Sequence, residues 1–210
     1  QPEQPEALFE GRPLLFVGRF VDKKDPLSVL HAYAHYRGLA GSQPRRLIMA
    51  GAGPLSDKLK QEALELGISA YVDFPGFLDT REVSVLMASA LMLLLPSREE
   101  QWGLVVNEAL AVGLPVMVSN VVGACDALVR HGENGYVVAP GAVEEMGRAM
   151  ALLSADRASW QAMSKTALAM APNGDVGHFA DGVEFLIDPG DQALAQRVSA
   201  FRLAVGMDRK

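Results

Sequence analysis

The sequence has little cysteine, no paired-aspartate metal motif and no long apolar run, and each absence removes a class of protein. The single cysteine, Cys125, forms no internal disulfide, so nothing points to an oxidising compartment. The four histidines lack metal-ligand spacing, and no Asp-x-Asp sequence occurs. The longest apolar stretch, residues 83–95, is shorter than the roughly 20 residues that cross a bilayer. We therefore expect a cytoplasmic protein without a bound metal or cofactor.

The composition is typical of a folded chain with a substantial core. Half of the 210 residues are hydrophobic and 21% are charged, and low-complexity tracts and heptads are missing. The 19 basic and 25 acidic residues give a net charge of −6, which argues against a nucleic-acid or membrane-surface binder. We expect no nucleic-acid partner, and any anionic ligand must be held by a local group of positive charges.

Short apolar runs alternate with longer amphipathic stretches, a pattern typical of a parallel sheet with helices on both faces. The fold class is therefore predicted to be α/β, a Rossmann-like, doubly wound parallel sheet of about six strands. Asp25 is expected to be an N-cap, because Pro26 suits the first position of a helix. The expected strands are residues 13–17, 46–50, 71–74, 91–95, 115–119 and 136–138, and the expected helices are 26–38, 55–66, 79–89, 103–112, 126–130 and most of the chain after 139.

The loops that leave the strands are the candidate site, because open α/β sheets bind ligands beyond the carboxyl ends of their strands. Four such loops contain glycine or charged residues, and we expect them to line one edge: residues 18–24, 51–54, 76–78 and 96–103. Gly51 and Gly53 are interpreted as a tight turn, since Ser56 stands where a dinucleotide fingerprint has its third glycine.

Positive groups in two of these loops form a candidate anion site. Arg19 follows Gly18 directly after a buried strand, where its guanidinium is able to grip a diphosphate with two hydrogen bonds. Lys24 adds a point charge. The segment Gly103 to Val105 opens a helix whose free amides attract anions, and Gly103 is expected to let a ligand come close.

Two glutamates flank that helix start. Glu108 is expected between Leu104 and Val112 in an apolar stripe, where a carboxylate needs hydroxyl donors from a ligand; the alternative is a helix-edge glutamate half in water. Glu100 precedes Glu108 with seven residues between them, so both are expected to approach one pocket. The alternative for Glu100 is an ordinary first-turn acid that the helix dipole favours.

A series of short motifs appears in one order over residues 14–150. They are Val17-Gly18-Arg19-Phe20 with Lys24, Ala50-Gly51-Ala52-Gly53-Pro54, Phe74-Pro75-Gly76, Leu95-Pro96-Ser97 before Glu100, Gly103-Leu104, Glu108-Ala109-Leu110-Ala111, Gly113-Leu114-Pro115-Val116 and His131-Gly132-Glu133-Asn134-Gly135. Each motif is weak alone, and the ordered set is specific. In this order they resemble the nucleotide-binding C-terminal half of a GT-B glycosyltransferase of the retaining "group 1" family (family four).

The resemblance implies a function and a role for each motif. The chain would bind a nucleoside diphosphate sugar, UDP- or GDP-linked, for transfer of the sugar to an acceptor hydroxyl. Arg19 and Lys24 would act on the diphosphate, Glu100 would lie beside the donor sugar, and Glu108 would grip the ribose hydroxyls. The other implied substrate-binding residues are Gly18, Gly103, Leu104 and Val105 around the diphosphate, and Gly76, Phe77 and Leu78 around the base.

The resemblance also implies a division of the chain. Residues 1–12 would be an interdomain linker remnant, 13–187 the donor-binding domain and 188–210 a C-terminal helical tail. The family's N-terminal acceptor domain is absent from this chain. We therefore expect that domain to be a partner, any membrane association to run through it, and the isolated chain to be inactive.

The sequence departs from the family pattern at three places. Asp25 stands where the family often has glycine, next to the supposed phosphate site. Residues 122–126 stand where many members have Gly-Gly-Ile-Pro-Glu, and residues 175–187 match an aromatic-rich segment poorly. A nucleotide-sugar 2-epimerase and a non-catalytic nucleotide-sugar-binding module stay open as alternatives, although the glutamate pair favours transfer.

Overall fold

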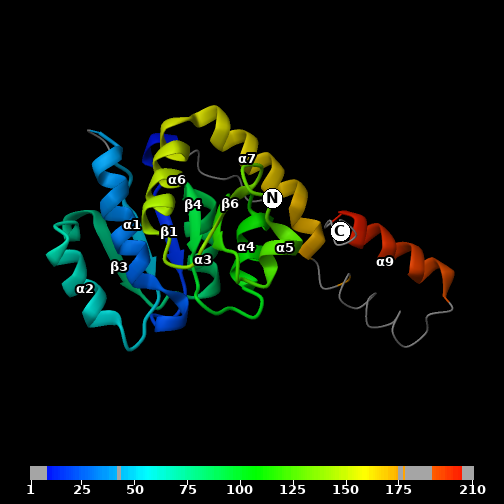
Figure 1. Ribbon diagram of the computed structural model, residues 1–210, viewed down its shortest axis with the longest axis horizontal. Helices are drawn as coiled ribbons and strands as arrows, with labels where there is room; N and C mark the ends of the chain where they lie inside the picture. The colour runs from blue at the N-terminus through cyan, green and yellow to red at the C-terminus, as the bar shows by residue number, and fades with distance from the viewer. Residues whose placement is uncertain (1–8, 42–43, 175–176, 178–190, 205–210) are drawn as a thin grey trace.

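Six parallel strands form the centre of the protein (Figure 1). The computed structural model describes residues 9–41, 44–174, 177 and 191–204. The strand order is β3-β2-β1-β4-β5-β6, and every neighbouring pair is parallel. The expected Rossmann-like sheet of six strands is confirmed. The strands are β1 Leu14–Val17, β2 Leu47–Ala50, β3 Val72–Gly76, β4 Met92–Leu95, β5 Val116–Ser119 and β6 Gly135–Val138.

The order of the strands reverses between β1 and β4. From β1 the chain moves outward through β2 to β3, and it then returns to place β4 on the other side of β1. The connections that leave β1 and β4 therefore run in opposite directions along the sheet. In open α/β sheets a ligand crevice lies at such a reversal, beyond the carboxyl ends of the strands.

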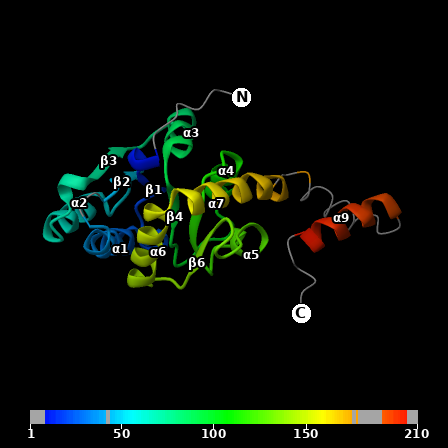
Figure 2. The same ribbon diagram turned by 90° about the horizontal axis from the view of Figure 1, so that it is seen from above.

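Helices cover both faces of the sheet, with α1 and α6 on one side and α3 and α4 on the other (Figure 2). Adjacent strand residues point to opposite faces, so Leu14 and Phe16 join one buried cluster while Leu15 joins a second. The helices are α1 Pro26–Leu39, α2 Ser56–Glu65, α3 Thr80–Ser89, α4 Leu104–Ala111, α5 Ala124–Leu128, α6 Val143–Ala155, α7 Arg157–Met170 and α9 Gln192–Ala204.

The motif at residues 131–135 turns the chain into β6. The Asn134 side chain is fully buried, where it accepts a hydrogen bond from the Arg130 amide (2.7 Å) and donates one to the Leu128 carbonyl (2.9 Å). A Cβ atom at Gly135 would lie 2.1 Å from the Val116 carbonyl oxygen, so only glycine lets β6 approach β5 here. In this motif, Asn134 and Gly135 therefore have a structural role, because they shape the turn into β6.

Asp25 occupies the expected N-cap position before Pro26, but its side chain does not cap the helix. Helix α1 does begin at Pro26, but the Asp25 side chain makes no capping hydrogen bond. The Asp25 backbone is left-handed (φ 51°, ψ 45°), whereas a capping residue usually has an extended backbone that aims its side chain at the helix amides. The turn before the helix, Asp22–Lys24, is what sets this conformation.

Parts of the expected linker and tail lie outside the described residues, namely 1–8, 178–190 and 205–210. Phe9 and Arg12, at the end of the expected linker, are buried against the domain, and Arg12 donates hydrogen bonds to the carbonyls of Ala88 and Ala90. In the tail, α9 is helical as expected. Within the described ranges, no helix has both the length and the apolar character needed to cross a membrane.

We expect the start of α7 to make stability depend on pH. The Asp156 carboxylate accepts hydrogen bonds from the Ala158 amide (2.9 Å), the Ser159 amide (3.2 Å) and the Ser159 hydroxyl (2.6 Å). These bonds lower the pKa of Asp156 below its ordinary value of 3.8. Because the folded-state pKa is depressed, the stabilisation is present above the unfolded-state pKa and is lost as the pH falls through the folded-state pKa.

Asp156→Ala should therefore lower the Tm at pH 7, and its difference from the unmodified protein should shrink as the pH falls below about 4. Thermal unfolding followed by circular dichroism from pH 7 to pH 3 measures this difference. Asp156→Asn is the control, because it keeps a capping oxygen without a titrating charge. A difference that stays constant over this range contradicts the assignment.

Candidate functional site

The loops that leave β1, β2 and β3 are joined through their main chains. The Gly18 amide donates to the Ala50 carbonyl (3.0 Å), and the Phe20 amide donates to the Ala52 carbonyl (3.0 Å). The Gly51 amide donates to the Gly76 carbonyl (2.8 Å), which extends the connection to the end of β3. These three loops therefore lie side by side along one edge of the sheet, as expected.

The loop after β4 joins the same edge from the other side. The amides of Arg98 and Glu99 both donate to the Lys23 carbonyl, at 2.8 and 3.3 Å. Further along, the Gly123 amide donates to the Glu100 carbonyl (3.1 Å) and brings in the loop after β5. The expected meeting of the four loops is confirmed, and the loop after β5 is a fifth member.

Glycine is required where these main chains touch. A Cβ atom at Gly51 would lie 1.9 Å from the Gly18 carbonyl oxygen, and one at Gly53 would lie 2.4 Å from the Phe20 carbonyl oxygen. Both distances are far below van der Waals contact. The glycines of this motif therefore let the β2 loop pack against the backbone beside Arg19, which is a structural role in shaping the site.

A cavity of about 400 Å³ contains Arg19 together with part of the expected base-binding loop. The Arg19 side chain is exposed, and it has no ion pair or hydrogen bond within the part of the chain that the structure describes. Phe77 is 84% exposed beside the same cavity. The lining residues are Val17, Gly18, Arg19, Ala50, Gly51, Ala52, Phe77, Leu78 and Val83.

Lys24 and Glu100 form an ion pair. The Lys24 ammonium contacts Glu100 Oε2, and the two side chains are 20% and 15% exposed. The family resemblance implies that Lys24 acts on the diphosphate and Glu100 lies beside the donor sugar, whereas the structure brings the two side chains into contact with each other. Across the described ranges, no three His, Cys, Asp or Glu side chains are grouped so as to hold a metal ion.

Helix α4 begins directly after the loop that leaves β4. The amides of Leu104 and Val105 have no hydrogen-bond partner among the described residues. Gly103 has φ +96°, and a Cβ atom there would lie 3.1 Å from Val122 Cγ1 and 3.2 Å from Leu95 Cδ2. The structure thus gives a reason for Gly103 that differs from the expected close approach of a ligand: a left-handed backbone packed against two apolar side chains.

The expected apolar stripe through Glu108 is wrong. Leu104 is 69% exposed and Glu108 is exposed one turn further on, whereas the buried residues of α4 are Val106, Ala109 and Leu110. The two faces were confused because every residue of this eight-residue helix except Asn107 and Glu108 is apolar. Glu108 is therefore a solvent-facing carboxylate one turn after Leu104. Because it is not buried, it does not need hydrogen-bond donors from a ligand, contrary to the expectation from the sequence.

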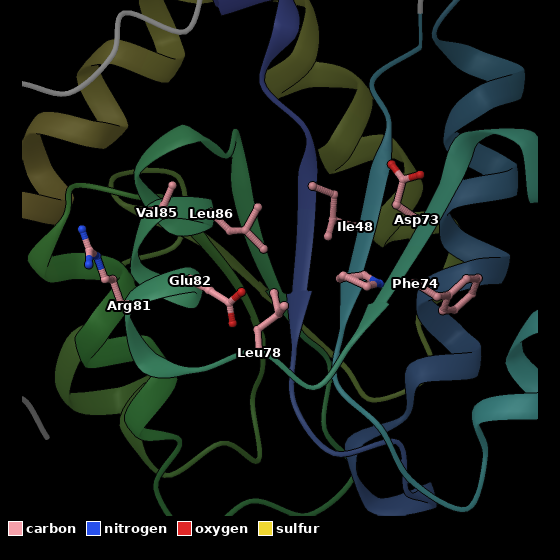
Figure 3. A pocket seen from close by; sticks show the side chains of 9 residues that line it. Ile48, Asp73, Phe74, Leu78, Arg81, Glu82, Val85 and Leu86 are labelled. Carbon is pink, nitrogen blue, oxygen red and sulfur yellow. The ribbon is translucent and has the colours of Figure 1, made fainter.

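A second cavity, of about 640 Å³, lies on the face of the sheet beside α3 (Figure 3). It includes Ile48 of β2, Asp73 and Phe74 of β3, and Val85 and Leu86 of α3. Leu78 also lines it, so this one residue is shared with the cavity that contains Arg19. None of the four charged residues expected to bind the donor lies in it.

A comparison with the sequence profiles of protein families shows to which family this chain belongs. The sequence profile of the family described as "Glycosyl transferases group 1" matches residues 3–174. The chain belongs to the group 1 glycosyltransferases. The family expected from the ordered motifs is thereby confirmed, and the sheet and its exit loops are those of a glycosyltransferase domain.

Individual proteins that are similar to this domain are also glycosyltransferases. The D-inositol 3-phosphate glycosyltransferase of Mycolicibacterium paratuberculosis is 36% identical over 175 residues, which are 80% of this chain and 38% of that protein. The crystal structure of WaaG, a glycosyltransferase involved in lipopolysaccharide biosynthesis, matches with a TM-score of 0.70 and 26% identity over 86% of this chain and 48% of that one.

A third relative, HepE from Anabaena, was solved in complex with UDP and matches with a TM-score of 0.69 and 25% identity, over 77% of this chain and 44% of that one. The chain spans less than half of the length of the curated relatives that it matches, 33% and 38% for two of them.

The sequence did not reveal one further contact of this glycosyltransferase site. The Arg98 guanidinium pairs with the buried Asp25 carboxylate, with Nε 3.1 Å from Oδ2. The only signal available was opposite charge in the loops after β1 and β4, and a mixed-charge loop is usually a solvated surface.

The close contact at Gly53 should be sensitive to one added methyl group. We expect Gly53→Ala to destabilise the protein by about 2 kcal/mol, because the new Cβ displaces the Phe20 backbone. Gly38→Ala is the matched control, since nothing lies within 4 Å of a Cβ there and alanine is favoured inside α1. Urea denaturation measures both variants, and equal stabilities would show that the contact is not needed.

Proposed function

We propose that this chain is the donor-binding half of a retaining glycosyltransferase that moves a sugar from a nucleoside diphosphate to an acceptor hydroxyl. The observation that carries the proposal is the cavity in which Arg19, without an ion pair among the described residues, meets Phe77 and Leu78. Helix α4 begins after the β4 loop at the same edge of the sheet, and the amides of Leu104 and Val105 have no partner among those residues. A cation that has no partner in the described part of the chain, next to an apolar loop, suits a ligand in which an anion is joined to a base. The UDP in the HepE crystal supports the same choice of ligand for this chain.

In the proposed complex the diphosphate is held by positive groups from two loops. The Arg19 guanidinium contacts phosphate oxygens with two hydrogen bonds, and Lys24 adds a second charge. The amides of Leu104 and Val105 donate from the positive end of the helix dipole. When the glycosidic bond breaks, negative charge grows on the leaving phosphate, and each well-placed donor stabilises that charge by about 3 kcal/mol.

The two glutamates bind the sugars of the proposed donor. Glu108 is exposed on α4 one turn after Leu104, where its carboxylate is free to accept hydrogen bonds from the two ribose hydroxyls. Glu100 lies beside the transferred sugar, and it holds Lys24 through their ion pair before the donor arrives. The loop of Gly76, Phe77 and Leu78 holds the base, largely through its main chain.

The acceptor side is expected to come from the part of the protein that the chain does not span. The acceptor hydroxyl would attack on the face from which the diphosphate leaves, so that the configuration of the sugar is retained. The residues of this chain would bind and orient the donor and stabilise the leaving group. A separate domain would supply the acceptor site, and the 210 residues alone would bind the donor without transferring its sugar.

Arg19 is expected to dominate binding of the diphosphate. Arg19→Ala should weaken binding of both UDP and inorganic pyrophosphate by about tenfold or more, the range for loss of a charge-assisted hydrogen bond. Isothermal titration calorimetry on the 210-residue chain measures both ligands. Arg81→Ala, in the second cavity, is the control and should leave both affinities unchanged. Equal affinities for the Arg19 variant and the unmodified chain would remove Arg19 from the site.

Glu108 should distinguish the ribose from the diphosphate. Glu108→Gln is expected to weaken UDP binding by about tenfold, because it removes the charged acceptor for the hydroxyls, and to leave pyrophosphate binding unchanged. The same calorimetry measures this difference. Glu145→Gln, at an exposed position of α6, serves as the control. If pyrophosphate and UDP lose affinity together, Glu108 acts on the phosphates or on the fold, and its ribose role fails.

A further inference from the structure

The residue that follows Lys24 has a backbone conformation that favours glycine. Asp25 has φ 51° and ψ 45°, and among the described residues it is the only non-glycine with a positive φ. Aspartate tolerates this region better than most side chains, but the conformation is still less favourable for it than for glycine. Asp25 also places a carboxylate directly beside a proposed phosphate-binding lysine, so its charge must be compensated.

Arg98 supplies that compensation. Its Nε lies 3.1 Å from Asp25 Oδ2 and its Nη2 lies 3.3 Å from Oδ1, so the guanidinium grips both carboxylate oxygens. The Ser28 hydroxyl donates a third hydrogen bond to Oδ2 (2.9 Å). The Asp25 side chain is 5% exposed, while that of Arg98 is 58% exposed. A buried carboxylate is thus neutralised by a cation that reaches it from the surface.

The Asp25–Arg98 pair lies next to the Lys24–Glu100 pair, and both connect the same two loops. Residues 24 and 25 leave β1, whereas residues 98 and 100 leave β4. The four charges sum to zero, and the hydrogen bond from the Arg98 amide to the Lys23 carbonyl holds the loops together. Without Arg98 the same four positions would carry a net charge of −1, and the Asp25 carboxylate, in the residue next to Lys24, would lose its ion-pair partner.

We propose that Arg98 is a positioning residue for donor binding, which keeps the Asp25 carboxylate from competing with the diphosphate for Lys24. The inference rests on the proposed function, because it requires that Lys24 binds a phosphate. It assigns a purpose to a residue of the β4 loop that is not itself a ligand contact. It also explains how this chain carries an acidic residue next to an anion site.

A double-mutant cycle tests the proposal. The affinities of the 210-residue chain for UDP and for inorganic pyrophosphate are measured by calorimetry for the unmodified protein, Arg98→Gln, Asp25→Gly and the double variant. Arg98→Gln should weaken both ligands by about tenfold, because the released Asp25 carboxylate then competes with the diphosphate for Lys24. Asp25→Gly should bind at least as tightly as the unmodified protein. In the Asp25→Gly background, Arg98→Gln should cost clearly less than tenfold, because no carboxylate is left at position 25 to compete for Lys24.

Further variants separate positioning from folding. Arg98→Lys keeps the charge and should retain most of the affinity, and Arg46→Gln, which breaks an exposed pair with Asp73 (2.7 Å) in β3, should change nothing. Thermal unfolding checks that each variant is folded. If Arg98→Gln weakens binding equally in the unmodified chain and in the Asp25→Gly variant, or does not weaken it at all, the inference is overturned while the proposed function stands. If the unmodified chain binds neither ligand, the proposed function itself fails and this inference fails with it.

Discussion

The close approach of the main chains at the carboxyl ends of the strands is the constraint on which the site depends. The loop after β1 exchanges backbone hydrogen bonds with the loop after β2 on one side and with the loop after β4 on the other. Glycine at positions 51 and 53 makes the first contact sterically feasible, since any side chain there would overlap a carbonyl oxygen. Because the backbones of neighbouring loops are in contact, charged side chains from different loops lie close enough to form ion pairs.

Two ion pairs between the loops after β1 and β4 neutralise four of the charges at this edge, whereas the cation proposed to meet the ligand first is not among them. Lys24 is paired with Glu100 and Asp25 with Arg98, whereas Arg19 has no partner within the described residues. In a protein of net charge −6, an unpaired cation over a cavity is a local exception to the overall field. In the proposed complex, a diphosphate would meet the Arg19 guanidinium and two amides at the start of α4, and a lysine that is paired with Glu100.

The elements of the fold were predictable because short apolar runs, typical of buried strands, alternate along the sequence with longer amphipathic stretches, typical of helices. Each of the six strands begins and ends within two residues of its expected bounds, since buried parallel strands such as Met92–Leu95 are short, wholly apolar runs. The exposed position of Glu108 was not predictable from periodicity. An almost wholly apolar helix has no single apolar stripe, so its buried face is chosen by the neighbours against which it packs. The lack of a side-chain cap at Asp25 was likewise not predictable, because the preceding turn sets its left-handed backbone.

The sequence by itself determined the sheet through its pattern of apolar runs, the family through the order of its motifs, and the charged residues near the sheet edge through their place after the strands. These features depend on local composition and on spacing along the chain, which the sequence contains directly. The pairing of Asp25 with Arg98, 73 residues away, was decided only by the tertiary structure. So were the ion pair between Lys24 and Glu100 and the cavity shared by Arg19 and Phe77. Such contacts depend on which strands become neighbours and on how closely their backbones pass, and neither is a property of any single segment.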